Sequence, residues 1–247
     1  MDKRTIKRLL KLKRKKYRFL YKEFIIEGKR LVKTGYECKA ITSKIYCTEK
    51  FFKKNTIWIQ NNNIESSFID IIPEKIFKKI SHTKSPSGIS AVCQIPNNNK
   101  MQSIRNKWVF LDKISDPGNL GTILRTASWF GIKNIALSQN CVDPYNPKTI
   151  RAGMGAHFYL RIFQNLEVID FIDTHTLIAM NTTGDDISQF IFPKKYVLIL
   201  GNEAHGISPK TTKTAKNDIT IKKLGLGESL NVATAASIIM YLATIKK

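Results

Sequence analysis

The C-terminal half of the chain holds four short runs of apolar residues, and these runs restrict its possible folds more than any other feature. The runs cover residues 108–112, 135–137, 176–180 and 196–200. Nearly every position in each run is apolar, which is typical of strands buried on both faces of a parallel sheet. Parallel strands need long crossovers between them, so helices are expected to alternate with these runs. The sequence therefore predicts an α/β domain with a parallel sheet over residues 107–247.

Two helices of this domain have recognisable limits. One is expected over about 120–130, with Asn119 as its N-cap and Gly131 just beyond its C-terminus. The other is expected over about 230–244. Its apolar stretch is too short to span a bilayer, which takes about 20 residues.

The N-terminal part predicts a second, smaller α/β domain over residues 1–95. The expected elements are a helix at 29–33 and strands at 24–27, 57–59 and 89–92. A polar, breaker-rich stretch begins at Pro96, and residues 96–106 are predicted to be a linker.

The charge of the chain points to a polyanionic partner. It has 41 basic and 19 acidic residues, a formal net charge of +22, and each phosphate neutralised by Lys or Arg releases condensed counterions. The first 18 residues hold ten Lys or Arg and one Asp, with a partial helical period of apolar residues that predicts a basic amphipathic helix. Compositional drift toward lysine is one alternative. A membrane-surface helix is another, although its apolar face is thin.

The four cysteines indicate neither a disulfide framework nor a metal site. Cys38, Cys47, Cys93 and Cys141 are scattered, with no CxxC pair and no His at ligand spacing. A reducing, cytoplasmic location is therefore expected. The basic N-terminus is not followed by the apolar stretch of a secretory signal, and a basic organellar presequence stays open as an alternative.

Three glycine-bearing segments follow predicted strands and hold the candidate chemistry. They cover residues 116–125, 200–207 and 225–233. Open parallel sheets bind ligands at the carboxyl ends of their strands, and glycines there allow the backbone to approach a ligand closely. Each segment also has a purely structural explanation. Asn119 or Ser229 could cap a helix, Glu203 could be a solvated carboxylate, and Gly201 could be an ordinary turn residue.

Neither common nucleotide-binding fingerprint occurs in the sequence. No strand is followed by GxGxxG, and there is no GxxxxGK[ST]. Dinucleotide-dependent enzymes and P-loop phosphotransferases are therefore disfavoured.

The three segments, taken in order, resemble the three motifs of the SpoU (TrmH) family of RNA 2′-O-ribose methyltransferases. The stretch 142–148, with Arg151 and Gly155, also matches the region that connects the motifs in this family. The resemblance is specific over about 107–247. It is looser over residues 1–95, which are similar to a substrate-binding domain of the ribosomal protein L30e type.

This resemblance implies a fold, a methyl donor and an assembly. The family has a deep C-terminal trefoil knot, an exception to the rule that chains do not thread loops. The knot loops bind S-adenosylmethionine, and the matching positions here are Gly201, Ile221 and Leu230. Family members are homodimers whose active site is completed across the interface.

The resemblance also implies a catalytic set, which comprises Asn119, Arg125, Glu203, Ser229 and Asn231. A cationic Arg125 would hold an RNA phosphate and stabilise the developing alkoxide of a ribose 2′-hydroxyl. Ser229 and Asn231 would position that hydroxyl, and Glu203 would hold Arg125 or neighbouring amides.

The sequence departs from the family pattern at two places. Lys222-Lys223 stands where a Pro-Met-like pair is common, and Ala233-Thr234 where Ser-Val is frequent. Both pairs lie beside the expected site residues. They are therefore expected to change the affinity for the donor or the way RNA reaches the site, and not to abolish methyl transfer.

The substrate stays open between ribosomal RNA, which the N-terminal domain favours, and transfer RNA. A non-catalytic RNA-binding factor for ribosome assembly is the alternative from another class. It is disfavoured because the polar set is complete.

Overall fold

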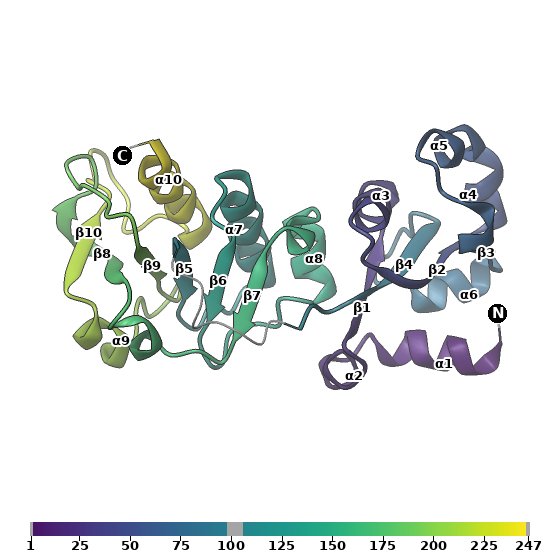
Figure 1. Cartoon of the computed structure of the whole chain (residues 1–247), viewed down its shortest axis with the longest axis horizontal. Coiled ribbons are helices and arrows are strands. Elements are labelled where there is room, and N and C mark those ends of the chain that lie inside the picture. The colour runs from purple at the N-terminus through teal and green to yellow at the C-terminus, as the bar shows by residue number, and fades with distance from the viewer. Residues whose placement is uncertain (1, 98–105, 246–247) are drawn as a thin grey trace. The chain divides into compact units, whose positions relative to one another are not determined.

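The structure is a computed structural model that describes residues 2–97 and 106–245. The described residues form two compact units (Figure 1). The first unit comprises residues 2–97 together with 145–158, and the second comprises 106–144 and 159–245. Most of the predicted linker, residues 98–105, lies outside the described part of the chain.

The second unit is built on a six-stranded sheet in which all strands are parallel. The strand order is β10-β8-β9-β5-β6-β7. The strands are β5 (Trp108–Leu111), β6 (Asn134–Leu137), β7 (Arg161–Gln164), β8 (Thr176–Asp186), β9 (Tyr196–Leu200) and β10 (Asn217–Thr220). The prediction of an α/β fold with a parallel sheet is confirmed.

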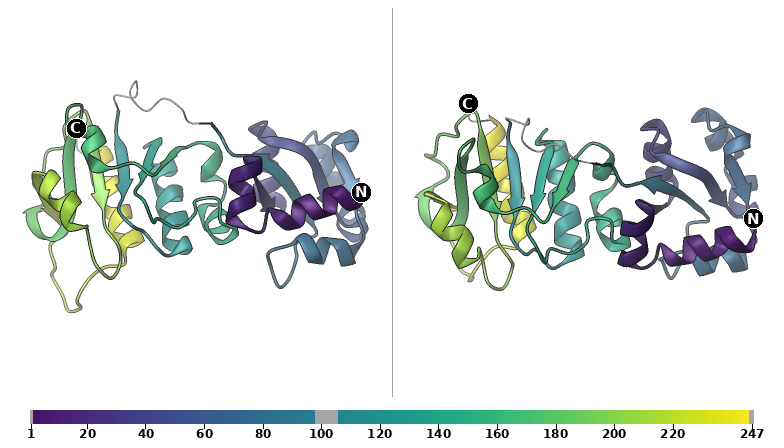
Figure 2. Two further views of the ribbon diagram at one scale, coloured as in Figure 1. Left: turned by 90° about the horizontal axis from the view of Figure 1, so that it is seen from below. Right: turned by 60° about the horizontal axis from the view of Figure 1, so that its bottom comes forward.

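Helices cover both faces of this sheet, which explains why its strands are apolar at every position. On one face, Trp108 and Phe110 pack with Phe171 of η3 (Val168–Phe171). On the other face, α7 (Pro117–Trp129) and α10 (Val232–Ile245) lie side by side (Figure 2). These two helices are joined by a Thr126–Ser237 hydroxyl contact of 3.2 Å. The short helix α9 (Pro209–Thr214) lies beside η3.

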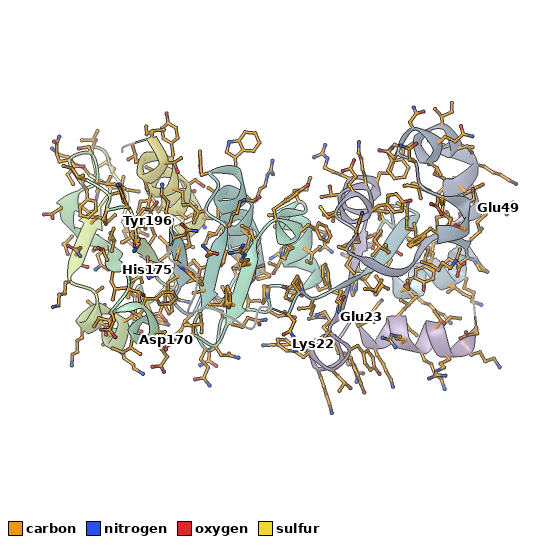
Figure 3. The ribbon with its side chains drawn as sticks, in the orientation of Figure 1. Lys22, Glu23, Glu49, Asp170, His175 and Tyr196 are labelled. Carbon is orange, nitrogen blue, oxygen red and sulfur yellow. The ribbon has the colours of Figure 1, made fainter. Side chains whose placement is uncertain are left out.

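Figure 3 labels two polar aromatic side chains of the second unit, Tyr196 and His175. The Tyr196 ring is fully buried, and its burial raises the pKa of the phenol. Burial lowers the pKa of His175, whose ring meets Trp108 edge-on at 6.5 Å between centroids. Tyr196 therefore belongs to the core, and the partly buried His175 ring packs at its edge.

The first unit has a four-stranded mixed sheet with the order β1-β4-β2-β3. β4 is antiparallel to β1 and β2, and β3 is parallel to β2. The strands are β1 (Glu23–Glu27), β2 (Ile41–Cys47), β3 (Ile69–Ile71) and β4 (Ile89–Gln94). The helices are α1 (Lys3–Lys11), α2 (Lys15–Tyr21), α3 (Lys29–Glu37), α4 (Glu49–Lys54), α5 (Thr56–Asn61), α6 (Glu74–Ile80) and α8 (Pro147–Gly153), with 3-10 turns η1 (Ser66–Phe68) and η2 (Ala156–Phe158). This is the smaller α/β domain that the sequence predicts.

Residues 145–158 belong to the first unit although they follow the first two strands of the second unit in the chain. The Tyr145 ring lies 5.0 Å from that of Phe24 on β1, and the Phe158 ring lies 6.2 Å from it. Ile150 of α8 is buried in the same cluster. The stretch that connects the motifs in sequence therefore supplies part of the core of the first unit.

Two expectations for the first unit are wrong. Residues 57–59 were expected as a strand and form α5, in which Ile57 is 73% exposed while Ile59 is buried. The side-chain amide of Asn62 donates to the Trp58 carbonyl at 2.7 Å, which stabilises the helical turn. A three-residue apolar run is too short to tell a strand from a helix.

The basic N-terminal segment forms two helices rather than one, because Arg18 turns back on the end of α1. Its buried guanidinium donates to the carbonyls of Leu12 and Lys13 at 2.9 and 3.0 Å. These carbonyls would otherwise be unpaired where the first helix ends. None of the helices in the described ranges is long and apolar enough to cross a bilayer.

Candidate functional site

The candidate site lies at the carboxyl edge of the second sheet, where β5 and β9 are neighbours. The chain moves outward from β5 through β6 to β7, then returns to place β9 on the other side of β5. The loops after these two strands therefore diverge at a topological switch point, where open parallel sheets bind ligands. The buried Asp112 carboxylate accepts the Ser208 amide at 2.8 Å, which ties the two loops together.

Asn202 organises the loop that follows β9. Its side-chain amide donates to the Lys113 carbonyl at 2.8 Å, across to the loop after β5. Its carbonyl oxygen accepts the amides of Ala204 and His205 at 2.9 and 3.2 Å. This residue was not among the predicted site residues. Asn202 lies between Gly201 and Glu203 in one of the three glycine-bearing segments, and this position could have identified it as a site residue.

Three of the five predicted catalytic residues are joined by hydrogen bonds. Asn119 donates from its amide to a Glu203 carboxylate oxygen at 2.7 Å. The Asn119 carbonyl oxygen accepts the amide of Asn231 at 3.1 Å. The three side chains come from all three motif segments, which are separated by 84 and 112 residues in the chain. The fold therefore brings these segments to one place.

The N-cap of α7 is not Asn119, as the sequence predicts, but an earlier residue. Asp116 is the N-cap of α7, and its carboxylate accepts the Asn119 backbone amide at 2.8 Å. Asn119 lies in the first turn instead, so its side chain is free to bond Glu203. The proline at the first helical position favours this earlier start. Gly131 follows the helix with a φ of +71°, as expected of a residue just past a C-terminus.

The last helix is capped by Asn231 rather than by Ser229. The Asn231 carbonyl oxygen accepts the Ala233 amide at 2.9 Å and the Thr234 amide at 3.4 Å. Asn231 thus uses one end of its amide for the cap and the other for Asn119. Ser229 is exposed and lies outside this hydrogen-bond chain.

Gly201 is required by the close approach of its own loop. A Cβ at this position would lie 2.3 Å from the Gly206 carbonyl carbon and from the Ile207 nitrogen. The two ends of the loop also exchange backbone hydrogen bonds between Asn202 and Gly206 at 2.9 Å. Gly201 therefore closes a tight loop beside the site.

Arg125 lies on α7 two turns after the Asn119 position, and its side chain is exposed. Among the described residues it has no hydrogen bond or ion pair. Glu203 pairs instead with Asn119 and, at 3.5 Å, with the Ser115 hydroxyl. Two partners were expected for Glu203, namely Arg125 or a neighbouring amide. In the structure its partner is the Asn119 amide, so Arg125 remains available to bind a ligand.

The third motif segment is exposed from residue 222 to residue 231. Leu224, Leu226 and Leu230 are 89%, 104% and 50% exposed, while Ile221 is half-buried. In the described part of the chain, no hydrogen bond involves residues 222–230. Free backbone groups beside apolar side chains are suited to a ligand that is part apolar and part polar. The departing residues Lys222 and Lys223 lie in this exposed segment.

The thiol near this edge of the sheet is partly buried and hydrogen-bonded within the fold. Cys141 donates from Sγ to the Leu111 carbonyl at 3.2 Å, and burial raises its pKa. The neutral thiol is a weak nucleophile. All four cysteines are free, and within the described ranges no cluster of His, Cys, Asp and Glu could hold a metal ion. The polar groups available at this edge are amide, carboxylate, hydroxyl and guanidinium groups.

Comparison with protein families identifies both parts of the chain. Residues 106–241, more than half of the chain, match the SpoU rRNA Methylase family. Residues 3–91 match the MRM3-like substrate binding domain. These two matches correspond to the two types of domain that the sequence predicts.

Individual relatives agree with these matches over nearly the whole chain. The 23S rRNA (guanosine(2553)-2'-O)-methyltransferase RlmP of Bacillus subtilis is 30% identical, over 94% of this chain and 92% of the relative. A solved protein of the TrmH family from Porphyromonas gingivalis is 28% identical, with a TM-score of 0.86 and coverage of 100% and 99%.

A solved AdoMet-bound rRNA methyltransferase from Sinorhizobium meliloti is 25% identical, with a TM-score of 0.81 and coverage of 98% and 94%. The joined Asn119, Glu203 and Asn231 side chains, the fold and these matches agree, and the chain belongs to the SpoU rRNA methylase family.

Proposed function

We propose that this protein transfers a methyl group from S-adenosylmethionine to a ribose 2′-hydroxyl of ribosomal RNA. The observation that carries the proposal is the hydrogen-bonded chain Glu203–Asn119–Asn231, which unites the three motif segments. Ribosomal RNA is favoured over transfer RNA because the Bacillus subtilis and Streptomyces viridochromogenes relatives are named for 23S rRNA. The substrate-binding domain matched by residues 3–91 supports an RNA substrate in general.

The residues at the carboxyl edge fit S-adenosylmethionine. The donor combines an apolar adenine with polar and charged groups, and residues 222–230 combine exposed leucines with unbonded backbone groups. Leu230, Ile221 and the loop closed by Gly201 would hold it. When bound, the donor supplies a methyl group already activated by its sulfonium.

The chain's own residues would align and activate the ribose hydroxyl, which is a poor nucleophile at neutral pH. Arg125 would hold the neighbouring RNA phosphate and stabilise negative charge as it develops on the 2′-oxygen. Arginine remains protonated in proteins, so the hydroxyl proton leaves to that phosphate or to water. Asn231 and Ser229 would position the hydroxyl, and Glu203 would fix the Asn119 amide that orients Asn231.

We further infer that the active form is a homodimer in the reducing cytoplasm, with the C-terminal segment threaded as a trefoil knot. Trp129 on α7, and Tyr241 and Ile245 on α10, are 84%, 49% and 55% exposed on adjacent helices. Apolar side chains gathered in this way favour a partner surface. Trp129→Asp should shift a dimer toward monomer in sedimentation velocity. A wild-type protein that sediments as a monomer at all concentrations would exclude the dimer.

The activity is tested by methyl transfer from labelled S-adenosylmethionine to purified ribosomal and transfer RNA pools. Label in ribosomal RNA, in an alkali-resistant dinucleotide, is expected because 2′-O-methylation blocks alkaline cleavage at that ribose. Label found only in transfer RNA would show that transfer RNA, rather than ribosomal RNA, is the substrate. Absence of both transfer and donor binding would favour a non-catalytic RNA-binding factor.

A further inference from the structure

The first unit contains a basic groove between α4, α6 and the loop that precedes β4. Its volume is about 390 Å³. Four lysines line it, and they are Lys29, Lys50, Lys54 and Lys78. They come from three different helices, α3, α4 and α6. Glu74 is the acidic residue in the lining, so positive charge converges on one hollow rather than running along one helix.

Three of these lysines are not paired with any residue that the structure describes. Among the described residues, Lys50, Lys54 and Lys78 make no hydrogen bond or ion pair. The fourth, Lys29, is fixed by a 2.9 Å bond to the Asn55 side chain and lies 5.1 Å from the centre of the Trp58 ring. Ammonium groups of like charge repel one another, so a bound anion would stabilise this groove.

Lys53, on the same helix α4, differs from the groove lysines because it forms an ion pair within the helix. Its ammonium lies 2.6 Å from the Glu49 carboxylate, and Figure 3 shows Glu49 on the outer side of α4. Lys53 does not line the groove. The free cations of α4 therefore lie on one side of the helix and the internal ion pair on another.

The wall of the groove is preorganised by a carboxylate. Ser87 lines the groove, and its amide donates to Glu27 at 3.2 Å. The same carboxylate accepts the hydroxyls of Ser81 at 2.8 Å and Thr83 at 3.0 Å. Gly88, with a φ of +82°, completes this wall, and a Cβ there would lie 3.0 Å from Phe51. These contacts fix the shape of the groove before any ligand binds.

The basic N-terminal helices are weaker candidates because several of their cations already have partners. Arg8 pairs with Glu23 at 2.9 Å, Lys13 donates to the Ser81 carbonyl at 2.8 Å, and Arg18 caps α1. These groups serve the fold of the unit. The groove lysines instead converge from three helices on one hollow, which makes them the better candidates for an external anion.

We propose that this groove binds the phosphodiester backbone of the RNA substrate. The proposal rests on the RNA-modifying function proposed above and adds where on the first unit the RNA is held. Lysine binds phosphate as a point charge and does not read bases, so the groove would position the RNA without selecting its sequence. Its volume is sufficient for a nucleotide-sized group.

The test compares two triple variants that remove the same number of lysines from the same two helices. One is Lys50→Gln, Lys54→Gln and Lys78→Gln, inside the groove. The matched control is Lys53→Gln, Lys75→Gln and Lys79→Gln, on exposed positions of α4 and α6 that do not line the groove. Binding of total ribosomal RNA is measured by filter retention without methyl donor, from about 50 to about 300 mM salt.

The groove variant should bind RNA about tenfold or more weakly at about 150 mM salt, and the control within about twofold of wild type. The slope of log affinity against log salt should fall by about two in the groove variant, at about 0.7 per lost contact with a single strand. Equal losses in both variants would mean that only net charge matters, and no loss in either would exclude the groove. Both results overturn the proposal.

Two controls separate this proposal from its premise. Donor binding by calorimetry should be unchanged in both variants, because the donor-binding residues belong to the second unit. If wild type methylated no RNA but the groove variant still lost RNA binding selectively, the proposed activity would fail and the groove would stand. If a triple variant did not fold, as judged by its melting temperature, Lys54→Gln against Lys53→Gln would repeat the comparison singly.

Discussion

The two units of this protein present two different kinds of polar surface. At the carboxyl edge of the second sheet, Asn119 is bonded to both Glu203 and Asn231. In the groove of the first unit, lysines such as Lys50 and Lys54 bond to no other described residue. Side chains that hold one another keep fixed positions, which suits the alignment of reacting atoms. Free ammonium groups on flexible stems suit a polyanion, so added salt should weaken binding in the first unit more than alignment in the second.

The largest expected effect is on Arg125, a cation of the site that has no described partner. Arg125→Lys keeps a positive charge but loses the planar fork of donors. We expect methyl transfer to fall by about 10²–10³-fold, or about 3–4 kcal/mol in the barrier, because an oriented charge-stabilising donor is lost. The measurement is single-turnover methyl transfer, with RNA affinity measured in parallel. Near-wild-type turnover at unchanged RNA affinity would show that any cation suffices. The fixed geometry of the guanidinium donors would then not distinguish this site from the lysine groove.

The next effect is on the loop that carries Glu203. Gly201→Ala places a Cβ 2.3 Å from backbone atoms of Gly206 and Ile207, so the loop must open, at a cost of about 2–3 kcal/mol. Donor affinity by calorimetry should fall by more than tenfold. Gly131→Ala is the control, because it lies outside the donor-binding segments and nothing lies within 4 Å of its added Cβ. Equal donor affinities in the two variants would contradict the role given to the tight loop.

A smaller effect is expected from breaking one link of the hydrogen-bond chain. Asn231→Ser can still cap α10 but loses the amide that donates to Asn119 at 3.1 Å. Ser and Asn cap helices almost equally well, so the melting temperature should hardly change. The rate of methyl transfer should fall by about tenfold, the effect of about one hydrogen bond. A lower melting temperature with an unchanged rate would assign Asn231 to the fold alone.

The smallest effect concerns acid stability of the first unit. Burial lowers the pKa of His82 to about 4, with further lowering by Lys13, Arg18 and Arg151 that Glu27 opposes. Unfolding restores a pKa near 6.5, so the unfolded chain binds the extra proton and stability falls as pH drops from about 6.5 to about 4. After allowance for partial exposure, the loss is about 1–2 kcal/mol.

His82→Gln should remove this part of the acid sensitivity. The measurement is the difference in urea-unfolding free energy between pH 7 and pH 4.5, for wild type and variant. Parallel pH dependences in the two proteins would exclude His82 as its source.

The local pattern of apolar residues was sufficient to predict those strands of the second unit that are buried along their whole length. The runs at 108–112 and 196–200 became β5 and β9 because strands covered on both faces must be apolar throughout. Gly131 past the end of α7 was recognisable because its φ of +71° favours glycine. Pattern failed at residues 57–59, where an exposed Ile57 and flanking asparagines made a helix from three residues that resemble a strand.

The candidate site could be predicted only as a set of residues. The sequence placed Asn119, Glu203 and Asn231 after strands, but it gave Asn119 a cap's role and left Asn202 aside. Asp116 took the cap, which freed the Asn119 side chain for Glu203. The choice between two neighbouring caps depends on where the helix starts, and that start is set by packing on the sheet as well as by local residues.

The sequence by itself determined the fold class, the family and the charge, because these depend on periodicity, motif order and composition. Only the tertiary structure decided which side chains are bonded to each other, that residues 145–158 complete the core of the first unit, and which lysines remain without partners. The physical reason is that hydrogen bonds and ion pairs act over a few ångströms between residues as many as 112 positions apart in the chain. Such contacts exist only after the chain has folded.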